Sequence, residues 1–159
     1  MVKLQMKIPQ TTSERIADVI GIIAILFMLI YTFMKYSGLP DTVPIHFGAN
    51  GEADGFGSKS TFIIWPAISI GMFIFLTILE RYPQAYNYPA RLNEQNAEAF
   101  YRNARKMLNY IKNIIAILFA YVTYEILNLN GKLSPIFWIL MALIFIVVII
   151  GAIRQRKIN

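Results

Sequence analysis

The side chains best suited to chemistry lie in one segment of the chain, residues 36–59. His46 stands there with three carboxylates, Asp41, Glu52 and Asp54. Histidine titrates near neutral pH, and together with carboxylate oxygens it can bind a metal ion. The same groups can instead hydrogen-bond to the backbone and hold a glycine-rich fold together. Two interpretations of His46 follow, a ligand or proton sensor and a structural residue.

The backbone of this segment has its own signals. Residues 36–59 contain five of the nine glycines. Residues 42–47 form a short extended stretch, in which Pro44 suits only an edge strand. Asn50-Gly51 predicts a turn, because both residue types tolerate positive φ. Asp54-Gly55 predicts a second turn.

Few enzyme classes are compatible with the composition. The absence of cysteine excludes thiol nucleophiles and disulfides, and a single histidine excludes a multi-histidine metal site. The motifs of zinc proteases, serine hydrolases and phosphate loops are missing. The one conceivable hydrolase would pair His46 with Ser58 or Ser60, and no motif spacing supports it. We expect no catalytic residue, no metal site and no cofactor.

The hydrophobic residues define the elements that position this segment. They make up 57% of the 159 residues, and charged residues make up 15%, whereas soluble domains average roughly 45–50% and about 25%. A membrane-spanning helix needs about 20 apolar residues. We predict an all-α integral membrane protein with a single domain over residues 1–159. Its four predicted spans are residues 16–35, 60–79, 110–129 and 133–153, with an ordered extracytoplasmic loop at 36–59 and a cytoplasmic connector at 80–109.

Local signals mark the beginnings of two helices. Thr11-x-x-Glu14 resembles a capping box at the start of the first helix. Pro135 suits the first turn of the last helix, where a missing N–H is not needed. Between the second and third spans, residues 97–111 carry apolar side chains at spacings of three and four. This amphipathic stretch either lies along the inner leaflet or continues directly into the third span.

The basic residues indicate the orientation. Twelve of the 15 lie in the two termini and in the middle segment from Arg81 to Lys112, and three lie in the other two loops. The positive-inside rule then places both termini and the connector in the cytoplasm. The net charge of +6 thus reflects topology, and we expect the lipid bilayer, not nucleic acid, as its counterpart. The cytoplasmic count includes Lys3, Lys7 and Arg15.

Two acidic residues fall within or beside the spans. Glu125 is the only acid well inside an apolar span, where carboxylates are costly and are functional by default. Its position near the end of the third span also allows it to sit at the outer headgroups. Asp18 fits a boundary residue paired with Arg15 or Lys112.

The segment at 36–59 resembles the defining loop of a bacterial family of short membrane proteins of unknown function. The resemblance rests on Leu39-Pro40-Asp41, on Pro44-Ile45-His46-Phe47, and on the run from Asn50 to Lys59. The same module forms the N-terminal part of the Sdp-type immunity protein, which protects a producing cell from its own secreted peptide toxin. The resemblance implies a multi-pass protein of the bacterial plasma membrane. The loop residues that would bind a ligand or hold the loop are Pro40, Asp41, Pro44, His46, Asn50, Gly51, Glu52, Asp54 and Lys59.

Three functions follow as hypotheses. The first is a non-enzymatic immunity or sensor protein, whose outer loop meets a peptide toxin and whose inner connector meets a regulator or anionic lipid. The second is a small transporter or channel subunit that uses Glu125 and His46. Because four helices are few for a transporter, this function requires a homo-oligomer or a membrane partner. The third is a structural partner of an exporter complex.

Overall fold

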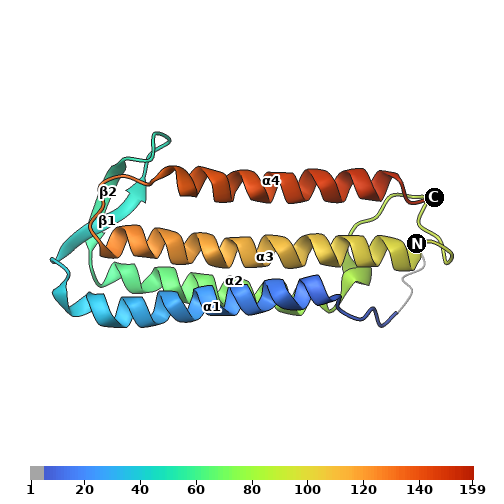
Figure 1. The fold of residues 1–159 in the computed structure, drawn as a ribbon, viewed down its shortest axis with the longest axis horizontal. Coiled ribbons are helices and arrows are strands. Elements are labelled where there is room, and N and C mark those ends of the chain that lie inside the picture. The colour runs from blue at the N-terminus through green and yellow to red at the C-terminus, as the bar shows by residue number, and fades with distance from the viewer. Residues whose placement is uncertain (1–5) are drawn as a thin grey trace.

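The computed structural model describes residues 6–159, which form four long helices and one small sheet (Figure 1). The first of the basic residues counted above, Lys3, lies outside the described residues. The long helices are α1 (Thr12–Lys35), α2 (Ile64–Glu80), α3 (Ala97–Leu127) and α4 (Pro135–Arg156). The strands are β1 (Thr42–Phe47) and β2 (Ala53–Ser58). Single 3₁₀ turns cover Tyr36–Gly38, Thr61–Ile63 and Pro83–Ala85.

Within residues 6–159, four helices are long and apolar enough to cross a membrane. This is the arrangement of a multi-pass membrane protein. The predicted all-α class needs one correction, because residues 42–58 contain a two-stranded antiparallel sheet. Large apolar side chains of α1, α2 and α4 lie exposed on the helix surfaces, and Phe33 is 87% exposed. Such surfaces suit lipid, which is as apolar as the side chains themselves.

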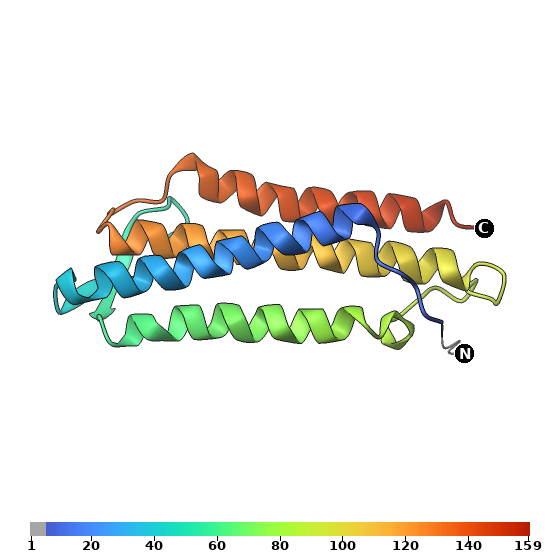
Figure 2. The same cartoon turned by 60° about the horizontal axis from the view of Figure 1, so that its bottom comes forward.

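Helix α3 is the central element of the bundle. It packs against α1, α2 and α4. Figure 1 shows it between α4 and the other two helices, and in Figure 2 α1 passes in front of it. The start of α1 and the C-terminus lie at one end of the bundle, and the sheet lies at the opposite end (Figure 1). We call these the terminal end and the sheet end.

The two predicted helix beginnings are confirmed. Helix α1 opens with a capping box, in which the backbone N–H of Thr11 donates to Glu14 Oε2 over 2.7 Å. Helix α4 opens at Pro135, and the Ser134 hydroxyl accepts a hydrogen bond from the Ile136 N–H at 3.4 Å. Each cap satisfies a backbone donor that the first helical turn leaves free.

The amphipathic stretch at 97–111 continues directly into the third span and does not form a separate helix. This is the second of the two predicted alternatives. Helix α3 has 31 residues, which makes it roughly 46 Å long at about 1.5 Å per residue. No glycine or proline interrupts it. The connector is therefore shorter than the predicted 80–109, since only residues 81–96 separate α2 from α3. The first turn of α3 buries Ala97, Phe100 and Tyr101 against Tyr88 and Leu92.

Candidate functional site

The sheet end contains a two-stranded hairpin that joins α1 to α2. The predicted turn at Asn50-Gly51 is confirmed, and Gly51 has φ of +79°, a backbone conformation that glycine adopts without strain. The predicted turn at Asp54-Gly55 is wrong, because both residues lie inside β2. Their pairing with β1 overrides the local turn preference. The hairpin is also tied to the loop after α3, since Leu133 N–H donates to Gly51 O over 2.8 Å.

His46 and Asp54 meet across the two strands. His46 Nδ1 lies 2.5 Å from Asp54 Oδ1, and the two side chains are 71% and 53% exposed. Two glycines leave room for this pair. A Cβ at Gly55, the register partner of His46, would lie 2.8 Å from His46 Cβ, and one at Gly48 would lie 2.9 Å from Asp54 Oδ2. Gly48 and Gly55 therefore leave the space that the His46 and Asp54 side chains occupy.

The strand register is irregular on both sides of His46. Successive side chains of a regular strand point to opposite faces, and a bulge can re-aim one of them. Here Ile45, His46 and Phe47 all line the same pocket. The irregular register explains how three consecutive residues of β1 can do so.

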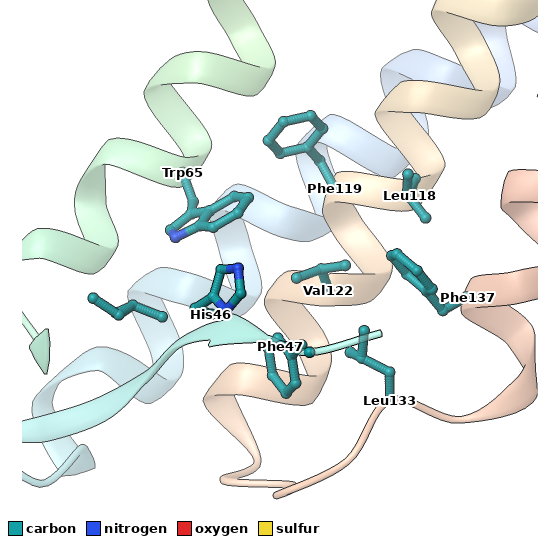
Figure 3. Close-up of a pocket in the computed structure, with 10 residues that line it drawn as sticks. His46, Phe47, Trp65, Leu118, Phe119, Val122, Leu133 and Phe137 are labelled. Carbon is teal, nitrogen blue, oxygen red and sulfur yellow. The ribbon is translucent and has the colours of Figure 1, made fainter. Parts of the chain in front are cut away.

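This pocket, which we call the sheet-end pocket, lies between β1 and the adjacent ends of three helices (Figure 3). Its volume is about 300 Å³. Figure 3 shows the His46 imidazole beside the Trp65 indole, with Phe119 and Phe137 on the opposite walls. His46 is its single ionisable lining residue. The full lining is Ile45, His46, Phe47, Gly48, Trp65, Leu118, Phe119, Val122, Leu133 and Phe137.

The other predicted loop residues form separate local contacts. Lys59 Nζ lies 3.2 Å from Asp41 Oδ1 and donates to Leu39 O over 3.2 Å. Asn50 donates to Glu52 over 3.0 Å, and Glu52 forms an ion pair with Lys132 at 3.2 Å. Pro44 is buried in β1 opposite Phe56, and Pro40 is exposed before the strand.

These separate contacts do not converge on a metal site. Among residues 6–159, no group of three histidine or acidic side chains is placed to hold a metal ion. The hydrolase pairing is also not formed, since Ser58 Oγ contacts Ser60 Oγ at 2.9 Å while His46 contacts Asp54. The hairpin chemistry thus reduces to the His46–Asp54 pair beside an apolar pocket.

A second polar site lies near the terminal end, between α1, α2 and α3. Lys112 Nζ lies 2.9 Å from Asp18 Oδ1 and 3.0 Å from Glu80 Oε1, and it stands 4.9 Å from the ring centroid of Phe73. The Lys112 side chain is 1% exposed. One ammonium therefore links two carboxylates from two other helices. We call Asp18, Glu80 and Lys112 the ionic triad.

Arg105 forms a second buried ion pair near the triad. Its Nε lies 3.0 Å from Glu14 Oε1, and neither side chain is more than 5% exposed. Arg105 also donates to the carbonyl oxygens of Ile8 and Pro9. These hydrogen bonds hold the segment before α1, at Ile8 and Pro9, against α3. A cavity of about 540 Å³, bordered by Asp18, Glu80 and Arg105, lies beside it.

Most of this network was not predicted from the sequence. The predicted pairing of Asp18 with Lys112 is confirmed, but Arg105 and Lys112 were counted only among the cytoplasmic basic residues. The informative signal was the helical spacing of Arg105, Asn109, Lys112 and Asn113 along one continuous amphipathic stretch. Asn109 and Asn113 both donate to Asp18 Oδ1, over 2.8 and 3.0 Å.

Glu125 lies at the other end of α3, two residues before the helix ends. Its side chain is buried, and Asn130 Nδ2 donates to Glu125 Oε2 over 2.5 Å. The Asn130 N–H also donates to the backbone oxygen of Glu125 over 3.0 Å. The loop after α3 therefore folds back to satisfy this carboxylate.

The short connector between α2 and α3 is aromatic. Tyr86 OH donates to Leu79 O over 2.9 Å, and Tyr88 OH donates to Pro83 O over 2.8 Å. Burial raises the pKa of both hydroxyls above the usual value for tyrosine. They therefore remain protonated donors in this connector at neutral pH.

Comparisons with known proteins place the hairpin within a defined module. A domain of unknown function (DUF1648) matches residues 23–70, which extend from within α1 through the sheet into α2. Over 155 residues, the chain is 33% identical to an uncharacterized protein of Archaeoglobus fulgidus, covering 87% of this chain and 84% of that relative. No solved structure matches the chain.

Proposed function

The chain belongs to the same family as the uncharacterized Archaeoglobus fulgidus protein, and on that premise we propose that it is a non-enzymatic membrane sensor or immunity protein. Its ligand would be a molecule that acts on the cell envelope, such as a secreted antimicrobial peptide. The observation that supports this proposal is the sheet-end pocket, an apolar recess of about 300 Å³ with His46 in its wall. Ligand pockets have this character, mostly apolar with few polar groups.

The proposed orientation places the sheet end outside the plasma membrane and the terminal end in the cytoplasm. It is supported by the basic residues: 12 lie in residues 1–15, 81–112 and 154–159, and three, Lys35, Lys59 and Lys132, lie toward the sheet end. A ligand from the envelope would then meet the hairpin first. The basic terminal end would face anionic lipid or a cytoplasmic regulator.

A survival assay tests the proposal. The chain is expressed in a peptide-sensitive bacterium, which is then exposed to a panel of secreted antimicrobial peptides. Leu118→Trp should fill the pocket, because Leu118 lines it. Phe145→Trp is the matched control, since Phe145 lies on α4 and is 62% exposed. We expect the natural chain and the control to protect against at least one peptide and Leu118→Trp to protect less.

Two outcomes would reject the immunity role. One is unchanged survival across the whole panel with the natural chain. The other is equal protection by Leu118→Trp at equal expression. Membrane fractionation confirms that both variants reach the membrane in equal amounts.

A transporter or channel subunit is the second candidate. The ionic triad supports it, because buried charges within membrane helices mark ion or proton paths. Glu125 would mark the opposite end of such a path. Two measurements on Glu125→Gln separate the candidates. In a transport protein, this variant should reduce the conductance of proteoliposomes. In an immunity protein, it should leave protection in the survival assay unchanged. A path through four helices would also need a homo-oligomer or a partner, which co-purification would reveal.

A further inference from the structure

The sheet-end pocket combines aromatic walls with a single imidazole. Phe47, Trp65, Phe119 and Phe137 come from β1, α2, α3 and α4 respectively. Trp65 and Phe119 have ring centroids 5.8 Å apart and tilted by 55°. Aromatic rings prefer tilted or offset partners at such distances. The walls are therefore suited to a flat aromatic group entering among them (Figure 3).

The volume limits what can enter. At about 300 Å³, the pocket stands at the lower end of the usual ligand-binding range of about 300–1,000 Å³. It accommodates one small ring system and not a complete drug-sized molecule. The ligand is either a small free aromatic compound or one side chain of a larger molecule.

Asp54 determines which nitrogen of His46 is free to bind. An ionised carboxylate only accepts hydrogen bonds, so His46 Nδ1, at 2.5 Å from Asp54 Oδ1, must carry a proton. In a neutral imidazole, Nε2 is then an acceptor. Among the described residues, Nε2 has no hydrogen-bond partner. With its imidazole neutral, His46 thus offers one acceptor, Nε2, beside the apolar walls of the pocket.

We propose that the sheet-end pocket binds an aromatic group that bears one hydrogen-bond donor, namely an indole or a phenol, and that His46 Nε2 accepts the bond from that donor. Asp54 acts as a positioning residue, because it sets the tautomer of His46. The donor belongs to a tryptophan or tyrosine side chain of a peptide or to the free aromatic compound. The inference rests on the proposed function only for the biological origin of the ligand.

Isothermal titration of the purified chain in detergent tests the donor. Indole is compared with 1-methylindole, which keeps the ring system but lacks the N–H, and empty micelles correct for partitioning. Loss of one hydrogen bond should weaken binding roughly 2- to 10-fold. His46→Phe should bind both compounds with equal affinity. Asp41→Asn is the control for a change beside the hairpin that leaves the pocket lining intact. Asp41 is an exposed acid directly before β1 and does not line the pocket, so this variant should keep the preference for indole.

The ring nitrogens can be observed directly, because His46 is the single histidine of the chain. With ¹⁵N-labelled histidine, indole should shift the Nε2 resonance of the natural chain, and 1-methylindole should leave it unchanged. This measurement decides the question even where His46→Phe does not fold. Equal affinities for the two compounds in the natural chain, an unshifted Nε2 resonance, or an indole preference that persists in His46→Phe would each overturn the proposal.

A short peptide, Gly-Trp-Gly, distinguishes the two sources of the donor. Tighter binding of the peptide than of indole identifies a peptide side chain as the ligand, and the reverse order identifies the free compound. Both orders support the site. If the survival assay fails while indole still binds through His46, the immunity role is wrong and the aromatic site stands.

Discussion

Lys112 is the side chain through which α1, α2 and α3 are joined near the terminal end. It is buried, and its ammonium lies within 3.0 Å of two carboxylates. Burial of an ammonium is costly, and the carboxylates offset that cost only while all three groups remain together. The triad is therefore expected to specify how the three helices pack.

Removal of this ammonium should destabilise the protein strongly. Lys112→Met would leave Asp18 and Glu80 without their cation, and breaking a buried ion pair typically costs about 3–5 kcal/mol. Lys106→Met is the control, because Lys106 lies on the same helix outside the triad. Thermal unfolding in detergent measures both. Equal midpoints for the two variants would show that the triad does not hold the helices together.

Gly21 provides a second test at the scale of one residue. A Cβ there would lie 2.0 Å from Asn113 Oδ1 and 3.1 Å from the Phe73 ring. Gly21→Ala should therefore cost about 1–3 kcal/mol, as overpacking does. In an Asn113→Ala background the same change should cost less, since the clashing atom is gone. Gly71→Ala, where nothing lies within 4 Å, is the control for unfolding measurements.

A penalty for Gly21→Ala that is the same in both backgrounds would contradict this packing. So would a penalty for Gly71→Ala of similar size. The comparison isolates the contact between α1 and α3 from the general effect of alanine in a membrane helix.

At the scale of elements, local patterns predicted the helices better than the contacts between them. The capping box at Thr11 and the start at Pro135 depend on neighbouring residues and were confirmed. The length of α3 was left between two alternatives, because an amphipathic pattern is the same on a membrane surface and in a bundle. The turn at Asp54-Gly55 was wrong, because strand pairing is a contact between distant residues.

The hairpin provides a prediction at this scale. Gly51 has φ of +79°, which costs a residue with a Cβ about 1–2 kcal/mol. Gly51→Ala should thus destabilise the hairpin and lower the midpoint of unfolding. Gly38→Ala should not, since a Cβ there meets nothing within 4 Å and its φ is not in the left-handed range. Equal effects of the two changes would show that the turn at Gly51 is not strained by alanine.

At the scale of the whole molecule, composition was sufficient to predict four spans but not the sites. Long apolar stretches are typical of helices that cross a bilayer. The structure has a helix at each of the four predicted spans. The His46–Asp54 pair was named only as part of a loop, because its geometry depends on an irregular strand register. The ionic triad was missed as a unit because its members lie 62 and 32 positions apart along the chain, at Asp18, Glu80 and Lys112.

The proposed orientation determines every role assigned to the two ends, and it can be measured directly because the chain contains no cysteine. Single cysteines at Asn50, in the hairpin turn, and at Gln95, in the connector, are exposed to a membrane-impermeant maleimide in intact cells. We expect Asn50→Cys to be labelled at once and Gln95→Cys to be labelled only after permeabilisation. Labelling of both positions in intact cells would contradict the proposed topology. Labelling of Gln95→Cys alone would show that the chain has the opposite orientation.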